Sequence, residues 1–579
     1  MRKIIIFILA AGLWLNIASA QSEEGAGFSL DIESKTIPFP KILRPCVDLS
    51  GRGLNRQKAW PQGLAAPEVL DAWEKDIGFG GVYRLQYNLW EISQLKDKEA
   101  REKLLSNYDN IIRRISQAGG IVILDIFGTP AGLGKALDRK IPPWDIRGFK
   151  SLIKGYMRDL SCNKKYNIWY ELWSGPDSDD FFLGAKQEYL NLYRLTAECV
   201  DELEAEFKIH IPLGGPSVSA WFQNIEGNTI ATAERSLIYE LIKFAARYHL
   251  PLDFISWHAY SSDSRIEQAA TTYKKSVPAL IRDWLSYFKF DKDTPLIIDE
   301  WNYDTNANLL PERQEKSYIC ASYILSRMKN MFEAGIDYQT YFSLEDFHDN
   351  NEGVARNVGL FGFEAEDSGY RGWPKSTYDM MKMLAASGQD VFVSGQDFNH
   401  DFIGVFATKG KDYASLIVYN YIDPDIALNY LSRNIAALNS AERKIILNII
   451  TSGNFKKILG KGVDISKIRA TNRIRVLLKK ALELNEQAVR FKEEPRNLKI
   501  TIKNLKGSYL YLRYVIDSSC SRDCKFSPAE EKEIANPDLY QETLVLKPYS
   551  VNMLIFRQKP QEPAVPAAAP AAVEKEASS

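Results

Sequence analysis

The sequence predicts a (β/α)8 barrel followed by an antiparallel β-sandwich. Between about residues 40 and 390, eight short apolar runs alternate with amphipathic segments of about 15–25 residues, which is typical of parallel strands joined by helices. Polar and aromatic residues follow seven of these eight runs, at the strand ends where a barrel places its ligand site. From about residue 391 the pattern changes to closely spaced strands. A doubly wound sheet is the alternative, but no Gly-rich phosphate loop follows the first run.

The alternation predicts the barrel elements in order. The eight expected strands are Ile42–Asp48, Gly81–Asn88, Ile121–Phe127, Asn167–Trp173, Ile209–Gly214, Phe254–His258, Leu296–Glu300 and Tyr338–Phe342. The expected helices between them include Lys98–Ala118, Asp145–Leu160, Lys186–Phe207, Thr232–Tyr248, Ser264–Phe288, Pro311–Ala334 and Ser376–Ala386. The first and last connections that follow a strand are long, and we expect them to shape the pocket.

The amino terminus resembles a secretory signal. Arg2 and Lys3 precede an apolar run, Ile4–Ile17, and Ala18–Ala20 fits an A-x-A cleavage pattern. The run is short for a membrane span, and no later run approaches 18 apolar residues. We therefore expect a secreted or periplasmic protein cleaved near Ala20, with a formal charge that changes from −1 to −3 when the two basic residues are removed.

Composition excludes several classes of function. The charge is nearly balanced, which does not favour nucleic acid as a partner, and the five histidines form no metal motif, so no metal or other cofactor is expected. Cys520 and Cys524 lie four residues apart in a polar loop and are expected to pair in an oxidising compartment, whereas the other four cysteines are expected to be buried thiols. The many aromatic residues suit sugar binding or simply fill cores.

The expected domains are a signal at 1–20, a barrel domain at 21–390, a sandwich at 391–557 and a disordered Pro/Ala-rich tail at 558–579. A charged, helix-patterned insertion at about 424–495 interrupts the sandwich. Within it, Lys456–Lys480 holds nine Lys or Arg residues and one acid, Asp464. This stretch is either a solvated helix face or a contact for an anionic polymer or surface.

The sequence around Glu300, PLIIDEWNYD, predicts a buried strand that ends on a carboxylate. Retaining glycoside hydrolysis needs two carboxyl groups about 5–5.5 Å apart, one as nucleophile and one as general acid. Glu300 suits the nucleophile, while Arg84 can keep it ionised and Tyr260 can orient it. The alternatives are a buried salt-bridge partner for Glu300, a structural ion pair for Arg84 and a core histidine for His258.

Several motifs together resemble glycoside hydrolase family 39 of clan A, which contains β-xylosidase and α-iduronidase-like enzymes. The resemblance extends from about Leu43 to Phe556 without the helical stretch. The matching motifs are Arg84-Leu85-Gln86 with Gln in place of the family's His, Gly214-Gly215-Pro216, Asp253, Phe254, Ser256, His258 and Tyr260, Asp299-Glu300-Trp301-Asn302, Asp346, and Arg513–Asp517. The resemblance implies a nucleophile at Glu300. It also implies substrate contacts from Arg84, Gln86, Trp173, Ser174, His258, Tyr260, Trp301 and Asp346.

The fourth strand departs from the family pattern. Tyr170–Asp177 reads YELWSGPD where the family has F-E-I-W-N-E-P-D, so Gly175 occupies the acid/base position and Ser174 replaces an Asn. Glu171 lies four residues earlier, roughly 13 Å deeper at about 3.3 Å per residue, and is expected to orient other groups. Asp177 is the expected surrogate acid. Further candidates are Asp179, Asp180, Glu345 and Asp346.

Two functions follow from this pattern. The first is a secreted family-39-type glycosidase that acts with retention on an oligo- or polysaccharide, with its acid relocated or supplied by the substrate. The second is a non-catalytic carbohydrate-binding protein that keeps the pocket of Arg84, His258, Tyr260 and Trp301. A transglycosidase or an unrelated barrel enzyme is a further alternative. The sequence does not name the sugar or the linkage.

Overall fold

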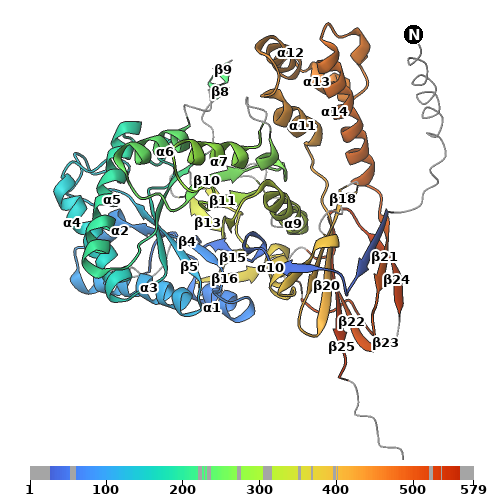
Figure 1. Cartoon of the computed structure of the whole chain (residues 1–579), viewed down its shortest axis with the longest axis horizontal. Helices are drawn as coiled ribbons and strands as arrows, with labels where there is room; N and C mark the ends of the chain where they lie inside the picture. The colour runs from blue at the N-terminus through green and yellow to red at the C-terminus, as the bar shows by residue number, and fades with distance from the viewer. Residues whose placement is uncertain are drawn as a thin grey trace, which may run out of the picture.

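The fold is known from a computed structural model. It describes residues 26–51, 60–219, 225–226, 229–230, 236–269, 275–303, 316–349, 354–366, 369–395, 399–400, 402–520, 524, 526–535 and 538–560. The predicted signal and the predicted tail beyond residue 560 lie outside the described residues. Figure 1 shows two bodies side by side, a barrel ringed by helices and a β-sandwich, with a group of helices above the sandwich.

The first body is a closed barrel of eight parallel strands, which confirms the predicted fold class. The strands in chain order are β3 (Val47–Asp48), β4 (Val82–Asn88), β5 (Ile121–Phe127), β6 (Ile168–Leu172), β7 (Leu213–Val218), β10 (Ile255–Tyr260), β11 (Leu296–Asn302) and β12 (Tyr338–Tyr341). Each strand except the short β3 is rich in buried apolar residues, because helices cover the outer face and side chains fill the interior.

Two predicted strands are displaced by proline. The predicted Ile42–Asp48 is a 3-10 helix at Lys41–Leu43 followed by a two-residue strand, because Pro45 has no N–H for the sheet. The predicted Ile209–Gly214 begins only at Leu213, directly after Pro212, and continues to Val218. Both corrections leave the strand order unchanged.

Helices follow the strands around the barrel. They are α1 (Pro67–Asp76), α2 (Leu89–Gln94), α3 (Lys98–Gln117), α4 (Ile146–Met157), α5 (Lys186–Phe207), α6 (Leu237–Tyr248), α7 (Val277–Tyr287), α9 (Ser317–Ala334) and α10 (Ser376–Ala385). The short helices α1 and α2 were not predicted. Helix α4 continues as a π-helical turn at Arg158–Asn163, and the predicted Ser264–Phe288 is a 3-10 turn at Ile266–Gln268 and then α7.

The interior of the barrel has an apolar floor below a polar layer. The floor is formed by Cys46, Val82, Ile123, Phe254, Ile297 and Tyr338, with Trp169 stacked on Phe254 at 5.5 Å between ring centroids. Side chains of one strand alternate between its two faces, so positions two residues later also point inward. These positions are polar: Arg84, Asp125, Glu171, Ser256, Asp299 and Thr340. The sequence thus builds a charged layer on an apolar floor.

The second body is a sandwich of two sheets. One sheet has the order β1 (Ala26–Asp31), β21 (Arg496–Lys503), β24 (Leu539–Leu546). The other has the order β2 (Thr36–Pro38), β17 (Asp390–Phe392), β19 (Ile403–Lys409), β20 (Tyr413–Asn420), β25 (Val551–Gln558), β22 (Ser508–Ile516), β23 (Glu530–Ala535), with β18 (Asn399–His400) beside β19. Since β1 and β2 pair with these sheets, residues 26–38 belong to the sandwich and not to the barrel domain as predicted.

Short hairpins and a helical insertion complete the described chain. The hairpins are β8 (Ile225–Glu226) with β9 (Thr229–Ile230), β13 (Phe347–Asp349) with β14 (Val354–Arg356), and β15 (Phe361–Glu366) with β16 (Gly369–Pro374). The insertion between β20 and β21 contains α11 (Ile426–Ile435), α12 (Ser440–Thr451), α13 (Asn454–Leu459) and α14 (Asn472–Phe491) around an apolar core of its own. It lies where the sequence predicted helices, and its basic stretch Lys456–Lys480 is largely exposed.

The described residues contain a disulfide bond. Cys520 and Cys524 form the predicted disulfide, and the other four cysteines are buried. Among the described residues, no helix has the length and apolar character to cross a membrane, and no cluster of His, Cys, Asp and Glu is arranged to hold a metal ion.

Candidate active site

The polar layer of the barrel is organised around the guanidinium of Arg84 on β4. Carboxyl oxygens from five residues lie within 4 Å of its nitrogens: Asp48 at 3.1 Å, Asp125 at 3.3 Å, Glu171 at 3.1 Å, Asp299 at 3.6 Å and Glu300 at 2.5 Å. The predicted structural ion pair of Arg84 and its predicted contact with Glu300 are therefore both present. Five strands each supply part of this cluster, through β3, β4, β5, β6 and β11.

A bulge in β11 explains why two consecutive acids reach the same cluster. Strand alternation alone would point Asp299 and Glu300 to opposite faces. The register against β10 shifts, so that Trp257 pairs with Ile298 while the next residue, His258, pairs with Glu300. The extra residue re-aims the strand, which is how bulges place side chains at sites. Asp299 and Glu300 consequently both contact Arg84.

Glu300 is the member of the cluster that a ligand can reach. Its side chain is 12% exposed, whereas the other four carboxylates are at most 2% exposed. Arg84 Nη1 holds Oε1 at 2.5 Å, and the Tyr260 hydroxyl donates to Oε2 at 2.8 Å. His258 Nδ1 lies 3.5 Å from Oε2, and the Ser174 hydroxyl donates to Oε1 at 3.5 Å. Each oxygen of Glu300 is therefore fixed in position.

Burial determines the protonation of the groups behind Glu300. It raises the pKa of Asp48 to about 6 and that of Asp125 to about 8, with Arg84 opposing both shifts. It also raises the pKa of Asp299 well above its usual value. One oxygen of Asp125 and one of Asp299 are buried without a hydrogen-bond partner, as suits a protonated acid. The cluster thus holds protons at neutral pH.

The two rings beside Glu300 are neutral. Burial and the charge of Arg84 together lower the pKa of His258 to about 3. Burial and the charge of Glu300 raise the pKa of Tyr260 well above its usual value. His258 Nε2 lies 3.1 Å from the Ser217 hydroxyl, which in turn donates to Asp299 at 2.6 Å. His258 is thus a hydrogen-bonding group of the site and also a satisfied buried histidine.

The loop after β6 contains Gly175, the position where the family resemblance expects an acid. Its φ is +57°, a left-handed backbone conformation that residues other than Gly, Asn and Asp rarely adopt. A Cβ there would lie 2.9 Å from Phe181 Cδ2 and 3.1 Å from Ser219 Oγ. The Gly175 amide donates to the Ser217 carbonyl at 2.8 Å, which ties this loop to the end of β7. The backbone is therefore built for glycine.

Two acids of the cluster can be judged as surrogates for the missing acid. Asp48 and Glu300 both contact Arg84 Nη1, at 3.1 and 2.5 Å, so their oxygens lie no more than 5.6 Å apart. This upper bound does not exclude Asp48 as the partner of a retaining pair, but its oxygens are taken by Arg84 and by the Ser50 amide, and it is 2% exposed. Glu171 is fully buried against Arg84 and the Ser256 hydroxyl, as its predicted depth implied. Neither acid faces the pocket.

Asp177 lies just beyond the end of β6, where a hydrogen bond ties it to the residue after β7. Its carboxylate accepts a hydrogen bond from the Ser219 amide at 2.7 Å, and its side chain is half-buried. Its charge acts on His258, raising the pKa that burial lowers, so it lies within electrostatic reach of the site. Asp179 and Asp180 follow it in the chain and are exposed.

Three residues expected to contact substrate lie in the core. Trp173 is fully buried, and its indole N–H donates to the Phe181 carbonyl at 2.9 Å. Trp301 is fully buried and donates to Gln339 at 2.7 Å. Asp346 is 2% exposed and accepts from Lys375 at 2.6 Å. In the structure all three side chains bond to protein groups, and their contact with a substrate stays a prediction.

Gln86 and Ser174 stay in the neighbourhood of Glu300. Gln86 is half-buried and donates weakly to Asp125 at 3.5 Å.

Sequence reasoning missed Asp48 and Ser217. The signal for Asp48 was its place at the end of the first strand, level with Arg84 on the neighbouring strand. Ser217 gave no such signal, because a second register shift, between β7 and β10, turns it inward.

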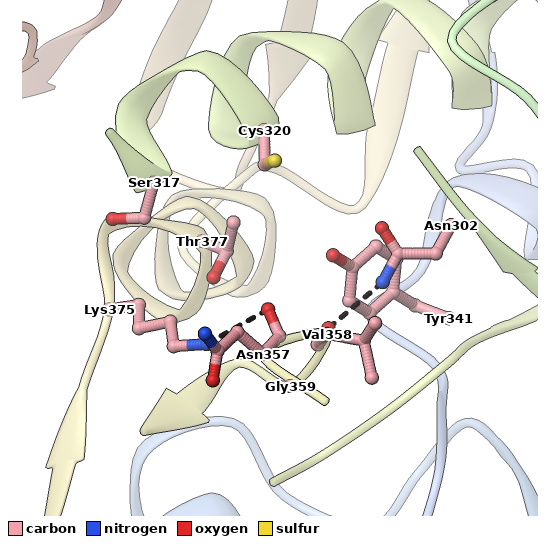
Figure 2. Close-up of a pocket in the computed structure, with 9 residues that line it drawn as sticks. All are labelled: Asn302, Ser317, Cys320, Tyr341, Asn357, Val358, Gly359, Lys375 and Thr377. Carbon is pink, nitrogen blue, oxygen red and sulfur yellow. Dashed lines mark hydrogen bonds between the residues drawn. The ribbon is translucent and has the colours of Figure 1, made fainter. Parts of the chain in front are cut away.

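A small cavity lies behind the end of β11 and is separate from the carboxylate cluster. Figure 2 shows Asn302 at one side and Lys375 with Asn357 at the other. Asn302 donates to the Val358 carbonyl at 2.9 Å and Lys375 to the Asn357 carbonyl at 3.3 Å. None of the five carboxylates around Arg84 lines it. The residues that line this cavity support the end of β11 and do not form the site around Glu300.

The fold and site define a class of protein: a (β/α)8 barrel with a carboxylate cluster at its strand ends and an appended β-sandwich. The sequence model of Glycosyl hydrolases family 39 matches residues 144–467, more than half of the chain, and the chain belongs to this family. The match covers Gly175, Tyr260 and Glu300.

Two curated relatives match parts of this chain. A beta-xylosidase of Caldicellulosiruptor saccharolyticus is 22% identical over 338 residues, which is 55% of this chain and 64% of the relative. A beta-xylosidase of Geobacillus stearothermophilus is 29% identical over 276 residues, or 43% and 48% of the two chains. The chain therefore spans less than two thirds of the length of either relative.

Two solved structures share the fold across nearly the whole chain. The GH39 enzyme from Xanthomonas axonopodis pv. citri aligns with a TM-score of 0.60 at 14% identity, covering 92% of this chain and 98% of that one. A monomeric beta-xylosidase from Caulobacter crescentus CB15 aligns with a TM-score of 0.59 at 14% identity, covering 92% and 99%.

Proposed function

We propose that the protein is a secreted glycoside hydrolase that cleaves O-glycosidic bonds with retention, and that Glu300 is its nucleophile. The observation that carries the proposal is the accessibility of Glu300 within a cluster of otherwise buried acids. Arg84 and Tyr260 each hold one of its oxygens, at 2.5 and 2.8 Å. A carboxylate fixed in this way at the open end of a barrel suits attack on an anomeric carbon.

In this mechanism Glu300 attacks the anomeric carbon while the bond to the leaving oxygen breaks. The product is a glycosyl ester of Glu300. Water then attacks the same carbon, gives one proton to the surrogate acid in its deprotonated form or to bulk water, and so releases the sugar and restores the carboxylate. His258 is neutral and accepts or donates hydrogen bonds without carrying charge. Two displacements at one carbon retain its configuration, which a stereochemical assay of the first product checks directly.

The mechanism also needs a group that protonates the leaving oxygen. Gly175 cannot supply this proton, and Asp48 and Glu171 are buried and engaged. Asp177 is the surrogate that we propose, because it is half-buried and its charge acts on His258. General acid catalysis contributes about 10²–10⁴ in rate, so without a surrogate only substrates with good leaving groups react readily.

The glycine at position 175 also favours a second candidate, a non-catalytic carbohydrate-binding protein. Such a protein would keep Arg84, His258 and Tyr260 around Glu300 as a sugar pocket and would have lost turnover. It would be stabilised by oligosaccharides without releasing product.

Aryl glycosides separate these candidates. p-Nitrophenyl xylosides come first, since the curated relatives are named beta-xylosidases. Other sugars follow, because Gln86 and Ser174 differ from the family pattern. We expect nitrophenol release by the wild type and none by Glu300→Ala. Glu206→Ala, an exposed acid paired with Arg158, is the matched control. Unchanged release by Glu300→Ala would exclude it as nucleophile.

The position of the acid is tested by leaving-group dependence. If Asp177 supplies the proton, Asp177→Asn loses about 10²-fold on alkyl glycosides and little on dinitrophenyl glycosides. An equal effect on both would exclude this role. Export is tested separately by amino-terminal sequencing of the secreted chain, which we expect to begin at Gln21.

A further inference from the structure

The residues that follow Tyr260 are held from two sides. On one side they contact α9 of the barrel. The Tyr323 hydroxyl donates to the Ser261 carbonyl, at 2.5 Å. Arg327 donates to the carbonyls of Asp263, at 2.9 Å, and Ala259, at 3.4 Å. The backbone on both sides of Tyr260 is thus fixed by hydrogen bonds from α9.

On the other side the same segment contacts the helical insertion and the strand that leads into it. The Tyr421 hydroxyl, one residue beyond β20, donates to the Ser262 carbonyl at 2.6 Å. Asn429 on α11 donates to the Ser262 hydroxyl at 3.3 Å. Figure 1 shows α11 on the side of the insertion that is next to the barrel. A part of the chain some 160 residues away in sequence therefore reaches the loop that carries Tyr260.

An ion pair links the two parts. The guanidinium of Arg433 on α11 donates to Asp263 Oδ1, and their side chains are 13% and 3% exposed. A charge pair removed from water depends on the presence of both partners, because either one alone would be left buried without compensation. Asp263 Oδ1 also accepts from the Arg265 amide at 3.0 Å, and the charge of Arg327 acts on this carboxylate, while the other oxygen of Asp263 is buried without a hydrogen-bond partner. Arg433 is the side chain by which the insertion pairs with Asp263.

We infer that the helical insertion positions Tyr260 on the nucleophile, and that Arg433 is the positioning residue through which it acts. The inference rests on the proposed function of Glu300. Asp263 lies three residues after Tyr260 on the same short segment, so a shift of the loop at Asp263 is passed to the hydroxyl 2.8 Å from Glu300. A misplacement of about 1 Å is enough to slow a positioned reaction by about 100-fold.

The test compares Arg433→Met with a control inside the same insertion. Arg443→Met is that control, because Arg443 donates to the Leu438 carbonyl within the insertion. Hydrogen–deuterium exchange of peptides covering Ala259–Asp263 and steady-state kinetics on an aryl glycoside are measured on the full chain. We expect exchange at Ser261 and Asp263 to become at least about tenfold faster in Arg433→Met, with kcat about tenfold lower and KM little changed.

A merely structural role would lower the melting temperature without separating kcat from KM. A misplaced Tyr260 hydroxyl instead lowers kcat and leaves KM little changed, because the hydroxyl contacts the nucleophile. Arg433→Lys keeps a cation at Asp263 and is expected to recover most of the change in exchange and in kcat. Arg443→Met is expected to match the wild type in exchange and in kcat.

The outcomes are distinct. Faster exchange at Ala259–Asp263 with unchanged kcat overturns the inference, as does unchanged exchange. If the wild type turns over no glycoside, the proposed function fails, whereas the exchange result still shows whether Arg433 holds this segment. If Arg433→Met does not fold, the pair Tyr421→Phe and Asn429→Ala removes two contacts to Ser262, leaves the ion pair intact and is judged by the same measurements.

Discussion

Asp125 offers a quantitative test of the electrostatics beneath the nucleophile. This acid on β5 is fully buried, and it accepts hydrogen bonds from Arg84 and Gln86. Burial raises its pKa from 3.8 to about 8, Arg84 opposes the rise and Glu171 adds to it. Because the unfolded chain releases this proton far more readily, the group makes folding dependent on pH. We expect Asp125→Asn, a neutral side chain of the same shape, to remove that dependence.

The sign follows from the two protonation states. Below about pH 4 the folded and unfolded chains both hold the proton, and its contribution to stability is complete. Between about pH 4 and pH 8 only the unfolded chain releases it, so the wild type loses up to about 1.4 kcal/mol for each pH unit. Above about pH 8 the loss is complete. Protons redistribute to neighbours such as Asp299, so the full slope is not reached. We expect the wild type to lose about 2–4 kcal/mol of stability between about pH 4 and pH 8.

Differential scanning calorimetry between pH 4 and pH 9 measures this effect. For a barrel of this size, 1 kcal/mol moves the melting temperature by about 1–2 °C. The melting temperature of Asp125→Asn minus that of the wild type should rise by about 2–8 °C from pH 4 to pH 8 and then stay level. Asp31→Asn is the control, because the hydrogen bond from Asn504 lowers the pKa of Asp31. A flat or falling difference for Asp125→Asn would refute the reasoning.

Three further predictions concern the surroundings of Glu300. Tyr260→Phe removes one hydrogen bond to a charged group and should lower kcat by about 10- to 100-fold without loss of fold, as activity and circular dichroism show. Because the pKa of His258 is about 3, His258→Asn should slow the reaction but leave the acidic limb of kcat/KM in place; a displaced limb would mean that this ring titrates. Gly175→Ala should cost about 1–2 kcal/mol by thermal unfolding, because φ is +57° and the new Cβ meets Phe181; no loss would contradict the described loop.

The barrel was predictable because its strands are continuous apolar runs. Ile121–Phe127 has the predicted bounds, and so does the amphipathic helix Lys186–Phe207. Pro45 and Pro212 displaced the starts of two strands, and the missing N–H of proline was a local signal for both displacements. The pairing of β1 with β21 joins residues more than 460 positions apart, and no local pattern in the sequence encodes it.

The site residues could be predicted where their position along a strand decides whether they reach the site. His258, Tyr260 and Glu300 lie toward the carboxyl ends of their strands, and Arg84, the third residue of β4, reaches Glu300 from deeper in the barrel. What the sequence could not show is which way a side chain turns after a bulge or a left-handed residue. Trp173, with φ at +68°, turns into the core, although its place after a strand suggested the pocket.

The central claim is that Glu300 forms a covalent bond to the sugar. An activated 2-deoxy-2-fluoro glycoside of the sugar that is cleaved best tests it most directly, since its leaving group needs no acid and the fluorine slows release of the intermediate. Mass spectrometry of the digested protein should find one fluoro-sugar on the peptide that contains Glu300, and none in Glu300→Gln. An adduct on another carboxyl group, or none while aryl glycosides are still cleaved, would contradict the account.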